Sequence, residues 1–270
     1  AKWTQYAPDH RWPMSWLYRR EGAKLLAFER QAAAAGDASL FVTEAEAQLF
    51  RQAAPEVAGR VGVMQNGVDA DYFSPDHTFD SPFPPGGPVL LFTGAMDYWP
   101  NIDAVVWFAG ELLPKVRRQF PDARFWIVGM NPAPAVQALA ADGVVVTGTV
   151  PDVRPYLAHA DVVVTPLRIA RGIQNKVLEA MAMAQPVVIS SASATGLEAS
   201  PGEDCEIAHS GDEFVSLIVG LLADVVLRRN MGQAARRRVV ARYSWAAHLA
   251  SLEGVLGAPL SSSASHAAPH

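Results

Sequence analysis

The sequence predicts an α/β fold built mainly from one doubly wound, Rossmann-like domain. Its strand patterns are continuous apolar runs rather than alternating ones, which is typical of strands covered on both faces. These runs lie at residues 89–94, 124–129, 144–148, 161–166 and 186–190. Helical patterns separate them, at residues 102–120, 133–141, 153–160 and 175–184. The alternation predicts a parallel sheet with helices on both sides, and a hydrophobic content of 50% is ample for its core.

Four parts follow one another along the chain. Residues 1–75 are too few for a second domain of this kind, and a linker rich in Pro and Gly is predicted at 76–88. The Rossmann-like domain then spans residues 89–256, and the tail 257–270, rich in Ser, Ala and His, is expected to be disordered. Within the first part, helices are predicted at 16–35 and 44–53, and strands at 39–43 and 59–64.

Composition excludes several classes of protein. A net charge of −5 gives no overall basic field, so we expect no nucleic-acid partner. Cys205 is the only cysteine, which excludes an intramolecular disulfide and a cysteine-based zinc site. No run of about eighteen apolar residues is present, and the first residues show no signal-peptide pattern. We therefore expect a cytoplasmic protein.

Several catalytic motifs are also missing. The sequence has no G-x-G-x-x-G after its first sheet strand and no G-x-x-x-x-G-K-[ST], which argues against dinucleotide oxidoreductases and P-loop nucleotidases. It also has no H-E-x-x-H and no G-x-S-x-G, the motifs of zinc proteases and α/β-hydrolases. No cluster of acidic residues suggests a metal site, so none is predicted. A phosphate and sugar site remains the best interpretation.

The segment at residues 168–190, RIARGIQNKVLEAMAMAQPVVIS, carries that interpretation. At about 100° per residue, Asn175, Lys176 and Glu179 share one helix face, and the opposite face is apolar and packs on the sheet. The preceding loop supplies further polar groups, from Arg168, Arg171, Gly172 and Gln174. A helix N-terminus with basic side chains suits a diphosphate, and one carboxylate can accept from two ribose hydroxyls. The alternative is an exposed Lys176–Glu179 ion pair without function.

Four motifs in this order give the chain a resemblance to a known family. They are NGVDADYFSP at 66–75, LLFTGAMDYWPNIDAV at 90–105, VVTGTVPDVRPYLAHADVVVTPL at 145–167 and GIQNKVLEAMAMAQPVV at 172–188. From about residue 3 to residue 256 the chain resembles bacterial glycosyltransferases of family 4 type, which have the GT-B fold and use nucleotide sugars. Within them it is similar to the exopolysaccharide subgroup that accompanies exosortase systems.

The resemblance implies two facing Rossmann-like domains, with the donor held mainly by the C-terminal one. Residues 1–75 then correspond to a remnant of the acceptor-side N-terminal domain, and we expect this fragment alone to be inactive. Glu179 matches the second Glu of the family's E-x7-E element, which typically binds the donor ribose. Arg171 stands where the first Glu is usual. After the first strand, Ala95 and Pro100 replace the Arg and Lys that bind the diphosphate in the family, and Arg168, Arg171 and Lys176 could supply that charge instead.

The implied function is transfer of a sugar, with retention of configuration, from a nucleotide-diphosphate sugar to a hydroxyl of a glycan or lipid-linked acceptor in exopolysaccharide synthesis. The residues expected to act in catalysis are Arg171, Lys176 and Glu179. Those expected to bind the donor are Gly94, Thr149, Val150, Arg168, Gly172, Gln174 and Asn175. No cofactor besides the donor is expected, and peripheral contact with the inner membrane surface is consistent with this role.

Some assignments stay open. Asn101 is predicted to be the N-cap of the helix that follows the first sheet strand. Two other functions compete with transfer, namely a sugar-nucleotide epimerase of GT-B fold and a non-catalytic nucleotide-binding or interaction module. The epimerase would need further acid and base groups, and no convincing pair is evident in the sequence.

Overall fold

The computed structural model describes residues 13–170 and 172–249. The chain divides into two compact units, Ala1–Gln65 and Asn66–His270. The turn at residues 66–69 thus belongs with the larger unit, as do residues 76–88, the segment predicted as a linker. Phe83 of this segment packs edge-on against Trp126, with ring centroids 4.9 Å apart. The predicted disordered tail lies outside the described residues.

The first unit is a small helical and strand assembly. It contains helix α2 (Met14–Ala35), strand β1 (Ser39–Phe41), helix α3 (Glu44–Ala53), the 3₁₀ helix η2 (Pro55–Arg60) and strand β2 (Val61–Val63). The two strands pair in parallel. The Thr43 hydroxyl caps α3 by accepting from the backbone N–H of Glu46, as the sequence of this helix start favours. Phe50 and a few small side chains form its core.

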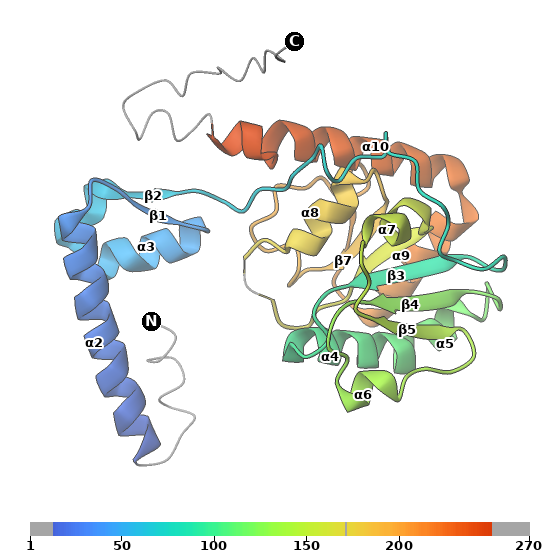
Figure 1. Ribbon diagram of the computed structural model, residues 1–270, viewed down its shortest axis with the longest axis horizontal. Helices are drawn as coiled ribbons and strands as arrows, with labels where there is room; N and C mark the ends of the chain where they lie inside the picture. Colours follow the sequence, from blue (N-terminus) through green and yellow to red (C-terminus); the bar gives the residue numbers. More distant parts are fainter. Residues whose placement is uncertain (1–12, 171, 250–270) are drawn as a thin grey trace, which may run out of the picture. The chain divides into compact units, whose positions relative to one another are not determined.

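The second unit is built on a parallel sheet of six strands (Figure 1). They are β3 (Val89–Thr93), β4 (Arg124–Val128), β5 (Val144–Gly148), β6 (Val162–Thr165), β7 (Val187–Ser190) and β8 (Glu206–Ala208). Their order is β5-β4-β3-β6-β7-β8, which is that of a Rossmann sheet. The predicted α/β fold with a parallel sheet is confirmed. The short strand β8 was not predicted, because three residues beginning with a glutamate make no apolar run.

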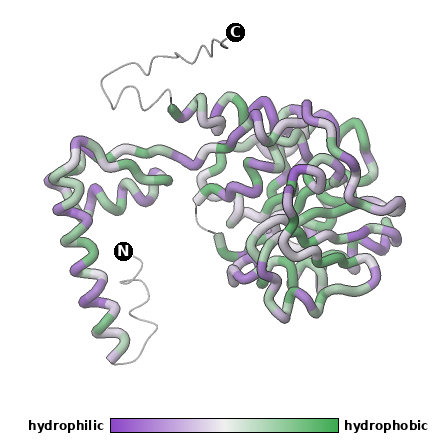
Figure 2. Tube along the Cα trace, in the orientation of Figure 1, coloured by the Kyte–Doolittle hydropathy of each residue, from purple (hydrophilic) through white to green (hydrophobic). Residues whose placement is uncertain are grey.

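Helices cover both faces of this sheet. They are α4 (Trp99–Trp107), the π-helical turn η3 (Phe108–Leu112), α5 (Leu113–Val116), α6 (Pro134–Gln137), α7 (Arg154–His159), α8 (Asn175–Ala182), α9 (Gly211–Ala223) and α10 (Val225–Arg242). One hydrophobic core lies against α4, α5 and α9, and the other against α7, α8 and α10. Figure 2 shows the hydrophobic strands inside this unit and the more hydrophilic segments around them. Among helices of the described residues, none combines the length and apolar character of a membrane span.

The first sheet helix begins earlier than predicted. Helix α4 starts at Trp99, because Pro100 occupies its first turn, where a missing N–H costs nothing. Tyr98 is therefore the N-cap residue, and the prediction that Asn101 caps the helix is wrong. Asn101 lies inside the first turn and is buried. Its side-chain amide can therefore bond to the loop that follows β3, where it donates to the Ala95 carbonyl.

Candidate functional site

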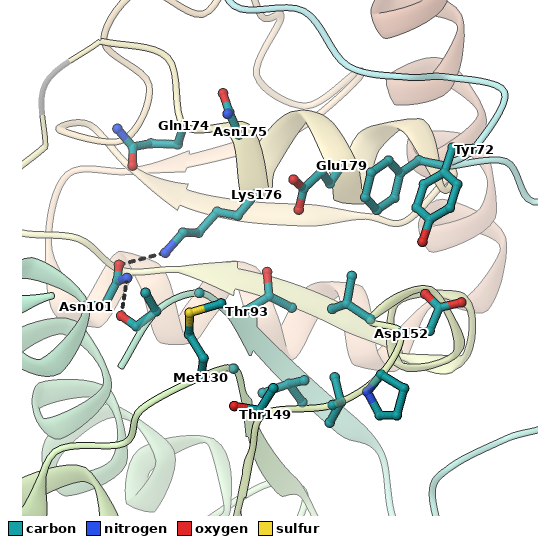
Figure 3. A pocket seen from close by; sticks show the side chains of 18 of the residues that line it. Tyr72, Thr93, Asn101, Met130, Thr149, Asp152, Gln174, Asn175, Lys176 and Glu179 are labelled. Atoms are coloured by element: carbon teal, nitrogen blue, oxygen red, sulfur yellow. Dashed lines mark hydrogen bonds between the residues drawn. The ribbon is translucent and has the colours of Figure 1, made fainter. Parts of the chain in front are cut away.

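A pocket of about 650 Å³ opens at the carboxyl ends of β3, β4 and β5, beside the start of α8 (Figure 3). The strand order reverses between β3 and β6, and a crevice is expected where neighbouring loops diverge in this way. Seven residues predicted for the site line the pocket, namely Gly94, Thr149, Val150, Gln174, Asn175, Lys176 and Glu179. The structure thus brings these seven residues together from three separate loops and one helix.

Lys176 reaches across the pocket to the start of α4. Its ammonium Nζ donates to Oδ1 of Asn101 over 2.7 Å, and the Asn101 amide Nδ2 in turn donates to the Ala95 carbonyl over 2.8 Å. The ammonium also lies 4.2 Å from the ring centroid of Phe92. Burial lowers the pKa of Lys176 to about 7, because desolvation disfavours the charged form. The site therefore holds a cationic group whose charge depends on pH near neutrality.

Glu179 lies one turn further along α8 and faces the same pocket. Burial raises the pKa of this carboxyl, and the nearby charge of Lys176 partly opposes that effect. The two described side chains form no ion pair, since the Lys176 ammonium bonds to Asn101 instead. Both groups are therefore in the pocket with bonding capacity toward a ligand, which differs from the alternative of an exposed surface pair.

Two glycines make the floor of the pocket where β3 and β4 end. Gly94 has a φ of 152°, and a Cβ there would lie 2.7 Å from Nζ of Lys176. Gly129 has a φ of 156°, and a Cβ there would lie 1.6 Å from the carbonyl oxygen of Gly94. A side chain at position 129 would thus push the ends of β3 and β4 apart, and a side chain at position 94 would displace Lys176.

Gly129→Ala is expected to destabilise the protein by about 2–4 kcal/mol, because the methyl group overlaps backbone atoms that cannot rotate away. Urea unfolding followed by circular dichroism measures this loss. Gly220→Ala is the matched control, since Gly220 lies inside α9 with open space at its Cβ position. That change should be neutral or stabilising by up to about 1 kcal/mol. Equal losses in both variants would contradict the close approach at Gly129.

Two predicted site residues lie elsewhere, and one cannot be placed. Arg168 forms a two-pronged ion pair with Asp103 and stands over the Trp107 ring, in a separate cavity of about 290 Å³. Gly172 does not line the main pocket; its φ is 64°, and its carbonyl accepts from Nε2 of Gln174 over 3.1 Å. Arg171 lies outside the described residues. Lys176 is thus the one cation from the predicted set that the described structure brings into the pocket.

The far end of the pocket contains residues that the sequence did not single out. Figure 3 shows Lys176 and Asn101 at one end, Tyr72 and Asp152 at the other, and Glu179 between them. The Arg154 guanidinium donates to both carboxylate oxygens of Asp152 and lies 3.7 Å from the Tyr72 ring centroid. These hydrogen bonds hold the pKa of Asp152 below its usual range.

The sequence offered different signals for these missed residues. The Asp-x-Arg spacing at residues 152–154, at the start of the helix predicted at 153–160, could have indicated the ion pair. Tyr72 lies in the motif at residues 66–75, but nothing local in that motif indicates that this side chain reaches a pocket formed by later residues. The described residues contain no group of three or more His, Cys, Asp or Glu side chains arranged to hold a metal ion.

A comparison with protein families decides what kind of protein this is. A family model described as glycosyl transferases group 1 matches residues 87–224, just over half of the chain. The chain belongs to this family. The matched residues include every strand of the six-stranded sheet and helix α8, so the assignment covers most of the pocket described above.

Solved structures of glycosyltransferases share the fold of this group 1 glycosyl transferase. A glycosyltransferase from Rickettsia africae matches with a TM-score of 0.70 and 15% identity, over 92% of this chain and 75% of its own. A sucrose-phosphate synthase from Thermosynechococcus elongatus matches with a TM-score of 0.65 and 20% identity, over 86% and 60%. Anabaena HepE, in complex with UDP and glucose, matches with a TM-score of 0.65 and 16% identity, over 83% and 64%.

These matches support the predicted likeness to GT-B glycosyltransferases at the level of fold. The chain spans less than two thirds of the length of the sucrose-phosphate synthase and of HepE. None of the curated proteins matches the chain significantly. At these identities, the likeness shows the fold and not the donor, the acceptor or the stereochemistry.

Proposed function

We propose that this chain provides the donor half of a retaining glycosyltransferase, which moves a sugar from a nucleotide-diphosphate sugar to a hydroxyl acceptor. One observation carries the proposal: Lys176 and Glu179 lie one helical turn apart in a single pocket, at the N-terminal end of a helix that follows a parallel strand. A cation with a helix N-terminus suits the diphosphate, and a carboxylate suits the ribose hydroxyls. The structure with UDP shows such a ligand in HepE, a protein of the same fold.

The order of groups in the pocket gives the ligand a direction. The diphosphate lies against Lys176 and the start of α8, and the ribose lies against Glu179. The base then extends toward Val150 and the Tyr72 and Asp152 end. The sugar, attached to the β-phosphate, is placed beyond Lys176, where the acceptor must approach.

This arrangement supplies the electrostatic part of transfer. When the nucleoside diphosphate departs, negative charge builds on the β-phosphate oxygens, and a positioned ammonium and the α8 N-terminus stabilise it. Lys176 is held toward that place by Asn101. We propose that the reaction uses these groups rather than a metal ion.

The wider biological role rests on the sequence resemblance. We propose a glycan or lipid-linked acceptor in exopolysaccharide or cell-surface glycan synthesis, and a cytoplasmic location with peripheral contact at the inner membrane. Support for an acceptor bearing apolar or sugar groups comes from Tyr98 and Trp99, which are 61% and 58% exposed close to the phosphate end of the pocket.

The direct test is calorimetric titration of this chain with UDP, GDP and ADP. We expect saturable binding of one of them, with the other two at least tenfold weaker. Glu179→Gln should also abolish binding. A carboxylate offers two acceptor oxygens to the two ribose hydroxyls, whereas an amide offers one oxygen and an NH₂ group that only donates. Absence of binding by all three nucleotides would contradict the proposal and favour the non-catalytic module. Product analysis with sugar derivatives of the nucleotide that binds would distinguish a transferase from an epimerase.

A further inference from the structure

Thr93 carries a buried hydroxyl with no hydrogen-bond partner. It is the last residue of β3, lines the pocket and is 4% exposed, and its Oγ1 meets neither a donor nor an acceptor. Figure 3 shows this side chain pointing from β3 toward α8, in the interval between Lys176 and Glu179. The local sequence explains its direction, because Thr93 shares the sheet face of Leu91, whose side chain packs in the α8 core.

A hydroxyl in this state lowers the stability of the folded protein. Removal from water costs free energy that a hydrogen bond normally restores, so buried polar groups are nearly always paired. An unpaired group in the wall of a ligand pocket is explained when the ligand supplies the partner. Valine would fill the same place on the strand without the cost, so packing alone gives no reason for a threonine here.

We propose that the Thr93 hydroxyl binds the nucleotide by donating a hydrogen bond to an oxygen of the α-phosphate. This inference rests on the proposed nucleotide-sugar function. The α-phosphate joins the ribose, which lies at Glu179, to the β-phosphate, which lies at Lys176, so it occupies the interval that Thr93 faces. A hydroxyl can donate to a phosphate oxygen, and Lys176 then remains available for the β-phosphate.

Thr93→Val tests the inference, because valine keeps the shape and removes the hydroxyl. Calorimetry should show affinity for UDP falling about ten- to a hundredfold, the range for a hydrogen bond to a charged group. The melting temperature of the free protein should stay the same or rise by a few degrees, since an unpaired polar group has been removed. Thr93→Ser should restore most of the affinity. A lower melting temperature with unchanged UDP affinity would overturn the inference and assign Thr93 a structural role.

Thr165→Val is the matched control. Thr165 also ends its strand, β6, is fully buried, and has an unpartnered Oγ1, but it does not line the pocket. It should share the effect on melting temperature and leave UDP affinity unchanged. An equal loss of affinity in Thr165→Val would show that the effect comes from the strands in general and would overturn the inference.

Titrations with uridine, UMP and UDP locate the contact. Affinity for UMP and UDP should fall by similar factors in Thr93→Val, while uridine binding, followed by ligand-observed NMR, should not change. A similar loss for uridine would place the contact at the ribose and overturn the phosphate assignment. If the wild-type chain prefers guanine or adenine nucleotides, the corresponding series replaces this one. If the wild-type chain binds no nucleotide, the proposed function itself fails. If the wild type binds and Thr93→Val binds equally well, only the inference about Thr93 fails.

Discussion

If the proposed function holds, Lys176→Met is expected to lower the turnover of sugar transfer by about 10²–10³-fold. The magnitude is that of removing one positioned donor from a developing oxyanion in a site that excludes water. Methionine keeps the length and apolar stem of the side chain but cannot carry charge to the β-phosphate. The buried ammonium is the feature that makes the effect large, because low local polarity strengthens its interaction with a phosphate. Steady-state kinetics with saturating donor measure the change.

Arg168→Met provides the matched control for this substitution. Arg168 is a second cation, on the loop that precedes α8, but it is paired with Asp103 in a different cavity. Its replacement should change turnover less than about threefold, provided that the variant stays folded. Melting temperatures of both variants show whether folding is kept. A Lys176→Met enzyme within threefold of wild type, or an Arg168→Met enzyme that is equally impaired, would contradict the role given to Lys176.

The affinity for a nucleoside diphosphate is expected to fall as pH rises above 7. The free protein has a Lys176 pKa of about 7, so at higher pH the ammonium must regain a proton before it can pair with phosphate. The loss approaches tenfold per pH unit until the pKa of the bound state is reached. Calorimetry between pH 7.5 and 9.5 measures it, in a range where the terminal phosphate, with a pKa near 6, is already ionised. Buffers of different ionisation enthalpy should reveal proton uptake on binding.

Lys176→Met again separates the source of this dependence. Its affinity should be low and nearly independent of pH over the same range, because the group that titrates is gone. Burial raises the pKa of Glu179, the neighbour on the same face, but this carboxyl is present in both proteins, so a difference between them reports Lys176. A wild-type affinity that stays constant from pH 7.5 to 9.5 would contradict the lowered pKa of Lys176.

Folding stability should respond to pH with the opposite sign. The pKa of Lys176 is about 7 in the folded protein and about 10.4 in an unfolded chain, so the unfolded chain binds more protons between these values. Stability of the wild type, relative to Lys176→Met, therefore rises with pH in this window and is lowest below pH 7. The unliganded protein thus becomes more stable over the same pH range in which its affinity for the nucleotide falls.

Most of the site could be located in outline from local sequence patterns. The strands β3 to β7 were predicted from apolar runs, and the face of α8 that carries Lys176 and Glu179 was predicted from helical periodicity. Both are local properties that a few consecutive residues determine. Strand β8 was missed because its local pattern is weak, and the start of α4 at Trp99 was missed because it depends on the single residue Pro100.

Pairings between side chains could not be read in this way. Lys176 bonds to Asn101, 75 residues earlier, and Arg168 bonds to Asp103, 65 residues earlier. Which of two nearby cations enters the pocket thus depends on where α4 places its acceptors. Thr93 shows the same limit, since a hydroxyl at the end of an apolar strand reveals nothing in sequence about whether it finds a partner.

Local sequence patterns were enough to predict a parallel α/β sheet and a cation and a carboxylate one turn apart on helix α8. They did not show that Lys176 serves the pocket while Arg168 does not, or that Thr93 faces the pocket unpaired, because these facts depend on contacts between distant segments. Periodicity decides which side of an element a residue occupies. The strand order, which places β3 beside β6, fixes what that side meets.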